Sequence, residues 1–154
     1  YCFPISQDTI VFTDYNIKGF FVKDNEGKVI GLQNIYQEKP MLKMKANEFS
    51  PSEYLKMKQY GEAKKAFRAM KMNEYQITYL AYDLMNKKPL DMDAVKLILD
   101  VALEQHPISS IVYSRWGDYY IKLNDKPSAI KSYQKALELD PNDEQTKEIL
   151  ENLK

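Results

Sequence analysis

The chain is poor in cysteine, histidine and arginine, and each shortage excludes a class of function. Its 154 residues include one cysteine, Cys2, and one histidine, His106. No internal disulfide can therefore form, and most metal sites built from thiolates and imidazoles are excluded. The only arginines are Arg68 and Arg115, so the chain has few guanidinium groups that could bind phosphate through two hydrogen bonds. These shortages favour a non-catalytic protein that needs no metal and no cofactor.

The chain also lacks an excess of either charge and any long apolar run. Lys plus Arg and Asp plus Glu both number 22, a balance that argues against nucleic acid as a partner. No apolar stretch approaches the roughly 20 residues of a membrane span. The sequence starts Tyr1-Cys2-Phe3, without Met or a charged leader, which suggests a C-terminal piece of a larger or processed protein.

Residues 1–48 carry strand signals. Runs of β-branched and aromatic residues predict strands at residues 9–13, 19–23 and 28–36, a short strand at 41–45 and a further one at 1–5. The segment from Asp24 to Gly27 has turn chemistry and predicts a hairpin. It lacks the alternating oxygen ligands of a calcium loop. We therefore expect a small antiparallel β-meander that is incomplete at its N-terminus.

Residues 49–154 carry helical signals instead. Ser50 can cap a helix, Pro51 suits its first turn and Glu53 completes a capping box. Apolar residues then recur at i, i+3 and i+4 as far as the C-terminus, which predicts amphipathic helices. The predicted fold class is thus α+β, with a β domain over 1–48 and a helical domain over 49–154.

An internal repeat appears within the helical region. Residues 110–143 resemble a tetratricopeptide repeat, because all eight signature positions hold an acceptable residue: Tyr113, Trp116, Gly117, Tyr120, Ala129, Tyr133, Ala136 and Pro141. A shift of 34 residues places a second copy over 76–109. Its matching residues are Tyr79, Val95, Leu99, Ala102 and Pro107.

The remaining helical segments fit the same pattern less well. With the 34-residue shift, Asp83 takes the small Gly position and Asn86 the Tyr position, which puts the helix packing of 76–109 in doubt. Residues 51–75 look like a degenerate first repeat with a short helix A over 51–59. Residues 144–154 look like the capping helix that repeat arrays require. The expected architecture is an α-α superhelical array.

The resemblance to tetratricopeptide repeats implies binding of a protein or peptide rather than catalysis. In that family the groove is lined by fixed positions of each helix A. Lys and Asn are absent from the positions that would clamp a carboxylate, so we expect an apolar segment from a partner helix, from residues 51–73 or from the β domain. The implied groove residues are Ile77, Leu80, Leu84, Lys87 and Lys88, then Ile111, Ser114, Asp118, Ile121 and Lys122.

The first 45 residues resemble a second family. The run from Phe3 to Ile5, the residues Gly19 to Val22 and the string from Asp24 to Leu32 are similar to the small β-rich C-terminal domain of serine β-lactamase and penicillin-binding-type hydrolases, especially of bacteria. This resemblance implies a fragment of an exported hydrolase, periplasmic or extracytoplasmic, whose catalytic domain lies upstream. The alternative is any β-meander with one good turn.

One motif of that hydrolase family occurs in the chain. Ser128-Ala129-Ile130-Lys131 reads S-x-x-K, in which a lysine amine takes the proton of a serine nucleophile. However, Ser128 and Lys131 flank the core residue Ala129 of the best repeat, and the companion motifs are missing. We therefore predict that the chain is no enzyme.

Three functions remain open from the sequence. The first is a non-catalytic interaction or scaffolding module. The second is an accessory region of a serine hydrolase, in which the array shapes access to an upstream active site. The third is a free-standing, chaperone-like adaptor. An array that only stabilises its neighbouring domain also fits the sequence.

Overall fold

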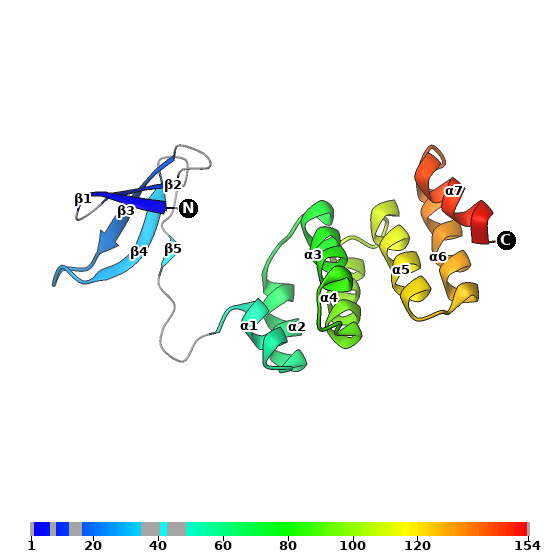
Figure 1. Ribbon diagram of the computed structural model, residues 1–154, viewed down its shortest axis with the longest axis horizontal. Coiled ribbons are helices and arrows are strands. Elements are labelled where there is room, and N and C mark those ends of the chain that lie inside the picture. The colour runs from blue at the N-terminus through cyan, green and yellow to red at the C-terminus, as the bar shows by residue number, and fades with distance from the viewer. Residues whose placement is uncertain (1, 7–8, 13–16, 35–40, 43–48, 154) are drawn as a thin grey trace. The chain divides into compact units, whose positions relative to one another are not determined.

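The computed structural model describes residues 2–6, 9–12, 17–34, 41–42 and 49–153 (Figure 1). Contacts divide the chain into two compact units, Tyr1–Glu48 and Phe49–Lys154. The first unit is an antiparallel sheet and the second is entirely helical, as the predicted α+β class requires. Within the described residues, no helix is both long enough and apolar enough to cross a bilayer.

The first unit is a five-stranded antiparallel meander in the order β1-β2-β3-β4-β5, which confirms the predicted meander. Asp24 shapes its clearest turn, because its side chain accepts hydrogen bonds from the amides of Glu26 and Lys28. Gly27 supplies the positive φ of that turn. Parts of the predicted strands, at residues 1, 13, 35–36 and 43–45, lie outside the described residues. The strands are β1 (Cys2–Ser6), β2 (Thr9–Phe12), β3 (Ile17–Lys23), β4 (Val29–Asn34) and β5 (Met41–Leu42).

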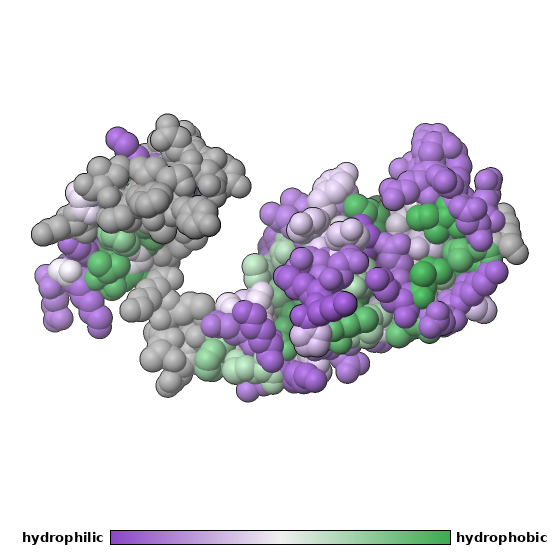
Figure 2. All heavy atoms as spheres, in the orientation of Figure 1, coloured by the Kyte–Doolittle hydropathy of each residue, from purple (hydrophilic) through white to green (hydrophobic). Residues whose placement is uncertain are grey.

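The second unit stacks three helix pairs and a last helix (Figure 1). Most of its helices begin at a residue whose side chain caps the first turn, as the sequence predicts for Ser50, whose capping box with Glu53 is complete. Gln59, before the second helix, makes no such hydrogen bond. On the face shown in Figure 2, hydrophobic residues of this unit show between the helices, among hydrophilic ones. The helices are α1 (Pro51–Lys56), α2 (Tyr60–Ala69), α3 (Glu74–Asn86), α4 (Met92–Gln105), α5 (Ser110–Lys122), α6 (Lys126–Leu139) and α7 (Glu144–Leu153).

The two full helix pairs differ in register. The second helices of the pairs repeat after 34 residues, since Asp91 caps α4 and Asp125 caps α6. The first helices repeat after 36 residues, since Asn73 caps α3 and Ser109 caps α5. The difference lies in the connections, because residues 87–91 join α3 to α4 whereas the shorter 123–125 join α5 to α6.

This shift corrects the predicted packing of residues 76–109. Ala81, rather than Asp83, takes the small position that Gly117 occupies in α5, and it is fully buried. Leu84, rather than Asn86, takes the position of Tyr120. The helix packing of this pair is therefore apolar, and the doubt raised by Asp83 and Asn86 was a consequence of the wrong shift.

Gly117 is required by the close contact between α5 and α6. A Cβ atom built on Gly117 would lie 2.4 Å from the ring of Tyr133. That ring is 1% exposed, and its hydroxyl donates a hydrogen bond of 2.7 Å to Asp118. In the preceding pair, Ala81 stands at the small position and Leu99 at the position of Tyr133. The smaller Leu99 side chain leaves room for the methyl group of Ala81.

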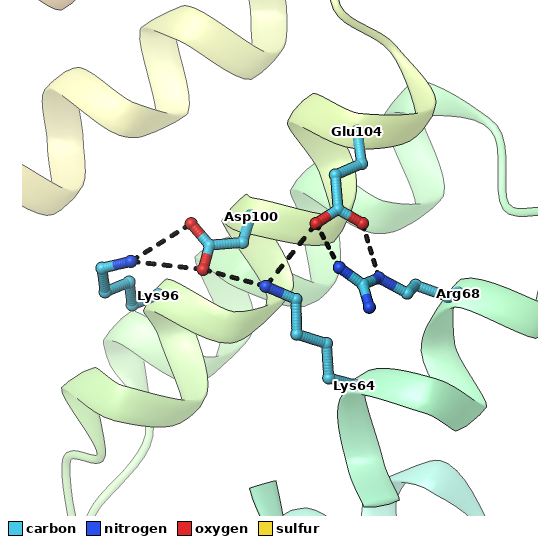
Figure 3. Close-up of polar contacts among 5 residues, drawn as sticks. All are labelled: Lys64, Arg68, Lys96, Asp100 and Glu104. Carbon is cyan, nitrogen blue, oxygen red and sulfur yellow. Dashed lines mark hydrogen bonds and ion pairs between the residues drawn. The ribbon is translucent and has the colours of Figure 1, made fainter. Parts of the chain in front are cut away.

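An ion-pair network joins α2 to α4 (Figure 3). Arg68 donates two hydrogen bonds of 2.6 Å to Glu104. Lys64 lies 3.3 Å from Asp100 and 3.6 Å from Glu104, and Lys96 binds Asp100 from the same helix. Exposed pairs of this kind add little to stability. The forked pair of Arg68 with Glu104 instead fixes how α2 lies on α4.

The helix caps predict a loss of stability in acid. Burial raises the pKa of Asp91 and Asp143, but hydrogen bonds outweigh it and lower both pKa values: those from first-turn groups at both sites, joined at Asp91 by one from the Tyr60 hydroxyl of α2. The hydroxyl and the amide of Ser128 lower the pKa of Asp125. A lowered folded pKa stabilises the fold above the ordinary carboxyl pKa of about 4, and this contribution disappears as the pH falls through the folded value.

We therefore expect urea-unfolding free energy to be lower at pH 3 than at pH 7. The triple variant Asp91→Asn, Asp125→Asn and Asp143→Asn keeps a side-chain acceptor at each cap but no titrating group. Its unfolding free energy should fall less between these two pH values than that of the parent chain. An equal fall in both proteins would show that the caps do not carry the acid sensitivity.

Candidate functional site

The candidate site is a groove lined by α3, α5 and α7, here termed the inner groove. It contains two adjoining cavities of about 290 and 270 Å³. Both cavities are lined by Arg115, Asp118 and Gln145, so they form one continuous surface. The cavities are also lined by Tyr75, Tyr82 and Met85 of α3, Ile111, Ser114, Ile121 and Lys122 of α5, and Thr146 and Ile149 of α7.

The charges at the centre of the groove neutralise one another. Asp118 accepts hydrogen bonds from the Arg115 guanidinium and from the Tyr133 hydroxyl. Burial, and then the hydrogen bond to the Asp118 carboxylate, raise the pKa of Tyr133, so its hydroxyl stays a donor. The guanidinium of Arg115 also lies 5.0 Å from the centre of the Tyr82 ring. The groove therefore offers paired charges and an aromatic wall at its centre.

The wall formed by α7 is held by hydroxyl groups. The Ser114 and Thr146 hydroxyls lie 2.8 Å apart in a hydrogen bond between α5 and α7. Thr146 also donates a 2.6 Å hydrogen bond to Asp143, which caps α7 by accepting from the Thr146 amide. Leu150 is buried on the same helix. Helix α7 is thus fixed against the last pair, and its Gln145 lines both groove cavities.

Three tyrosines of α3 are exposed along one face. Tyr75, Tyr79 and Tyr82 are spaced by four and three residues, so they share one side of the helix. Their exposed fractions are 67%, 69% and 48%. The rings of Tyr79 and Tyr82 lie 6.4 Å apart. Tyr75 and Tyr82 each line one of the two groove cavities and so form part of its α3 wall, and Tyr79 lies beside Tyr82 without lining either cavity.

The structure places the predicted groove residues of α5 and those of α3 in different locations, and their binding role stays a prediction. The predicted α5 residues all line the groove: Ile111, Ser114, Asp118, Ile121 and Lys122. On α3 the 34-residue shift chose residues two positions too late. The correct 36-residue shift relates Ile111 to Tyr75 and Asp118 to Tyr82. The signal that could have revealed it is Asn73, followed by Gln76 as a capping box.

The five residues predicted on α3 and its loop lie elsewhere. Ile77 is fully buried in the core, which excludes it from any groove. Leu80 and Leu84 are half-buried against the core cluster that includes Leu55 of α1. Together with Lys87 and Lys88, which follow α3, they line a separate cavity of about 430 Å³ beside α1. Which occupant fills the groove, a partner helix, residues 51–73 or the β domain, stays a prediction.

The S-x-x-K motif has a structural role in α6. The Ser128 hydroxyl hydrogen-bonds the Asp125 carboxylate, and the Ser128 amide donates to the same side chain at 3.1 Å. Lys131 is exposed one turn later. No hydrogen bond joins these two side chains in the described part of the chain. His106 ends α4, and its ring lies 2.8 Å from the Met72 carbonyl. The described residues include no cluster of His, Cys, Asp or Glu suited to a metal.

Comparison with known families supports the repeat. Residues 110–143 match the tetratricopeptide repeat family, with the boundaries expected from the sequence. This match confirms the last repeat. The other two helix pairs and α7 extend it into a tetratricopeptide-like array. No curated protein matches the chain. The resemblance of residues 1–48 to a hydrolase domain is not supported by the family match, which lies wholly in the helical unit.

Solved structures of tetratricopeptide domains are among those similar to the chain. One is the NMR structure of the first tetratricopeptide domain of human RPAP3, which is 24% identical over 67% of this chain and 83% of that chain, with a TM-score of 0.49. Another is the first tetratricopeptide domain of Spaghetti (RPAP3) bound to the HSP90 peptide SRMEEVD. It is 23% identical over the same shares of the two chains, with a TM-score of 0.48.

Proposed function

We propose that the helical unit binds a protein segment in the inner groove and acts as a non-catalytic interaction module. The observation that carries the proposal is the exposed row of Tyr75, Tyr79 and Tyr82 beside two cavities. Tyrosine is enriched at the energetic centres of protein interfaces, because it combines a large apolar ring with a polar tip. A row of three tyrosines left mostly in water is unusual for a surface that has no partner.

The energetics favour an apolar or aromatic segment over a highly charged one. Aromatic side chains bury on the order of 150–250 Å² each, and burial contributes about 25 cal/mol per Å². Covering the exposed parts of three rings therefore supplies several kcal/mol against the cost of association. The central charges of Arg115 and Asp118 already satisfy each other, so we expect them to orient the segment by hydrogen bonds.

The test starts from peptides selected on the full chain. A displayed library of random 12-residue peptides is panned against the protein, and the affinity of the selected peptides is measured by fluorescence anisotropy. Replacing both Tyr79 and Tyr82 by alanine should weaken binding at least thirtyfold, since truncation of central interface residues costs about 2 kcal/mol or more. Both side chains are exposed, so the melting temperature should hardly change.

A matched control uses an exposed apolar residue outside the groove. Leu123 is 45% exposed at the end of α5, and it lines neither groove cavity. Leu123→Ala should leave the affinity within twofold of the parent value. If the selected peptides bind the tyrosine variant as tightly as the parent, the inner groove is not the binding site. If the library yields no binder at all, the proposed function is wrong.

A further inference from the structure

A cavity beside α1 exists because that helix is short, and its rim carries more lysines than carboxylates. Helix α1 has 6 residues, whereas α3 and α5 each have 13. The short helix contributes Leu55 to the core but leaves Leu80 and Leu84 only half covered. The result is an aliphatic floor formed by Leu55, Leu80, Leu84 and Ala94 in a cavity of about 430 Å³, here termed the α1 cavity.

The rim of the α1 cavity is basic. Four lysines line it, Lys56, Lys58, Lys87 and Lys88, against two carboxylates. Both carboxylates have partners: Asp83 pairs with Lys87, and Asp91 accepts hydrogen bonds from the Tyr60 hydroxyl and the Ala94 amide.

Three of these lysines make no close ion pair, although Lys56 lowers the pKa of Glu53 and Lys58 lowers that of Asp91 from a longer distance. Lys56, Lys58 and Lys88 form no ion pair with the part of the chain that the structure describes. They belong to α1, to the turn after α1 and to the loop after α3. The cavity thus presents an excess of positive charge, from three separate segments, around an apolar floor.

We propose that the α1 cavity binds an acidic, aliphatic segment of a partner protein. The aliphatic side chain enters the floor between Leu80 and Leu84, and carboxylates on both sides of it pair with Lys56, Lys58 and Lys88. Because the lysines lie on different segments of the rim, they can pair with several carboxylates spaced along one peptide segment of the partner. A free carboxyl terminus is not required. The proposal concerns a surface separate from the inner groove and does not depend on the function proposed for it.

The probe is a fluorescent peptide of sequence GELEELG with a blocked C-terminus. Its binding to the full chain is measured by fluorescence anisotropy. We expect saturable binding that weakens several-fold when the salt concentration rises from 50 to 200 mM, as ion pairing requires. A peptide with lysine in place of glutamate and a peptide with serine in place of leucine should each bind at least tenfold more weakly. Equal binding of either peptide would overturn the proposal.

Two sets of charge reversals localise the site. The triple variant Lys56→Glu, Lys58→Glu and Lys88→Glu should weaken binding at least tenfold. The matched control, Lys71→Glu, Lys126→Glu and Lys131→Glu, changes the net charge equally at exposed lysines outside the cavity and should have little effect. Equal losses in both would show nonspecific attraction and would contradict the proposal. Circular dichroism verifies that both variants stay folded.

Three further measurements separate the remaining occupants. The variant Tyr79→Ala with Tyr82→Ala should bind the acidic peptide as the parent does, and a loss there would place the peptide in the inner groove instead. The same peptide with a free C-terminus should bind no more than threefold more tightly. Binding that requires the free terminus would contradict the proposed internal segment. Dimerisation abolished by the lysine triple variant would show that a second copy occupies the cavity, and would also overturn the proposal.

Discussion

Replacing Gly117 by alanine should lower the melting temperature by roughly 4–12 °C, because overpacking a filled core costs about 1–3 kcal/mol. The new methyl carbon would lie within 2.7 Å of three ring atoms of Tyr133. The ring cannot move away easily, since it is buried and hydrogen-bonded to Asp118. Differential scanning calorimetry of the two proteins measures the effect.

Two further variants show whether the clash is the cause. Gly61 lies in α2, and a Cβ atom there meets nothing within 4 Å. Gly61→Ala should therefore leave stability unchanged or raise it by up to about 1 kcal/mol. In a Tyr133→Leu background, which copies the Ala81 and Leu99 pairing, Gly117→Ala should cost less than about 0.5 kcal/mol. A full loss in that background would assign the effect to something other than the ring.

Replacing Phe67 by alanine should reduce the unfolding free energy of the helical unit by about 3–5 kcal/mol. Phe67 of α2 is 2% exposed and belongs to the same core cluster as the residues of α3 and α4. The degenerate first repeat is therefore part of one core, and urea unfolding should keep a single transition. The free energy at zero urea is obtained by linear extrapolation.

The control for this variant lies three residues further on. Met70 is 45% exposed just after α2, and Met70→Ala should change the unfolding free energy by no more than about 0.5 kcal/mol. A loss below 1 kcal/mol for Phe67→Ala would contradict a shared core. So would a second transition, because it would show that residues 51–69 unfold separately from the later helices.

The sequence predicts the last repeat well for a physical reason. Gly117 and Tyr133 depend on each other sterically, and Ala129 and Ala136 allow the helices to approach closely. Such constraints leave identifiable residues at fixed spacings, which is why the boundaries at 110 and 143 were predicted correctly. The antiparallel meander was also predicted where the structure describes it, because Asp24 and Gly27 impose their turn locally.

The groove was only half predictable, since its α3 wall depends on a connection of variable length. The matching prolines, Pro107 and Pro141, fix the ends of α4 and α6 at a spacing of 34 residues. The prolines carry no information about the first helix of each pair. The connection before α4 is two residues longer than the one before α6, so α3 and α5 are 36 residues apart instead of 34. Tyr75 and Tyr82 were consequently overlooked, while Ile77 was assigned to a surface although it is buried.

The most direct test of the inner groove is an NMR titration of the isotope-labelled full chain with a selected peptide. Binding in the groove should shift the amide signals of Tyr75, Tyr79, Tyr82, Arg115 and Ile121, and signals of α6 residues outside the groove, such as Lys135, should stay in place. Shifts confined to α6, with none on α3, would contradict the account.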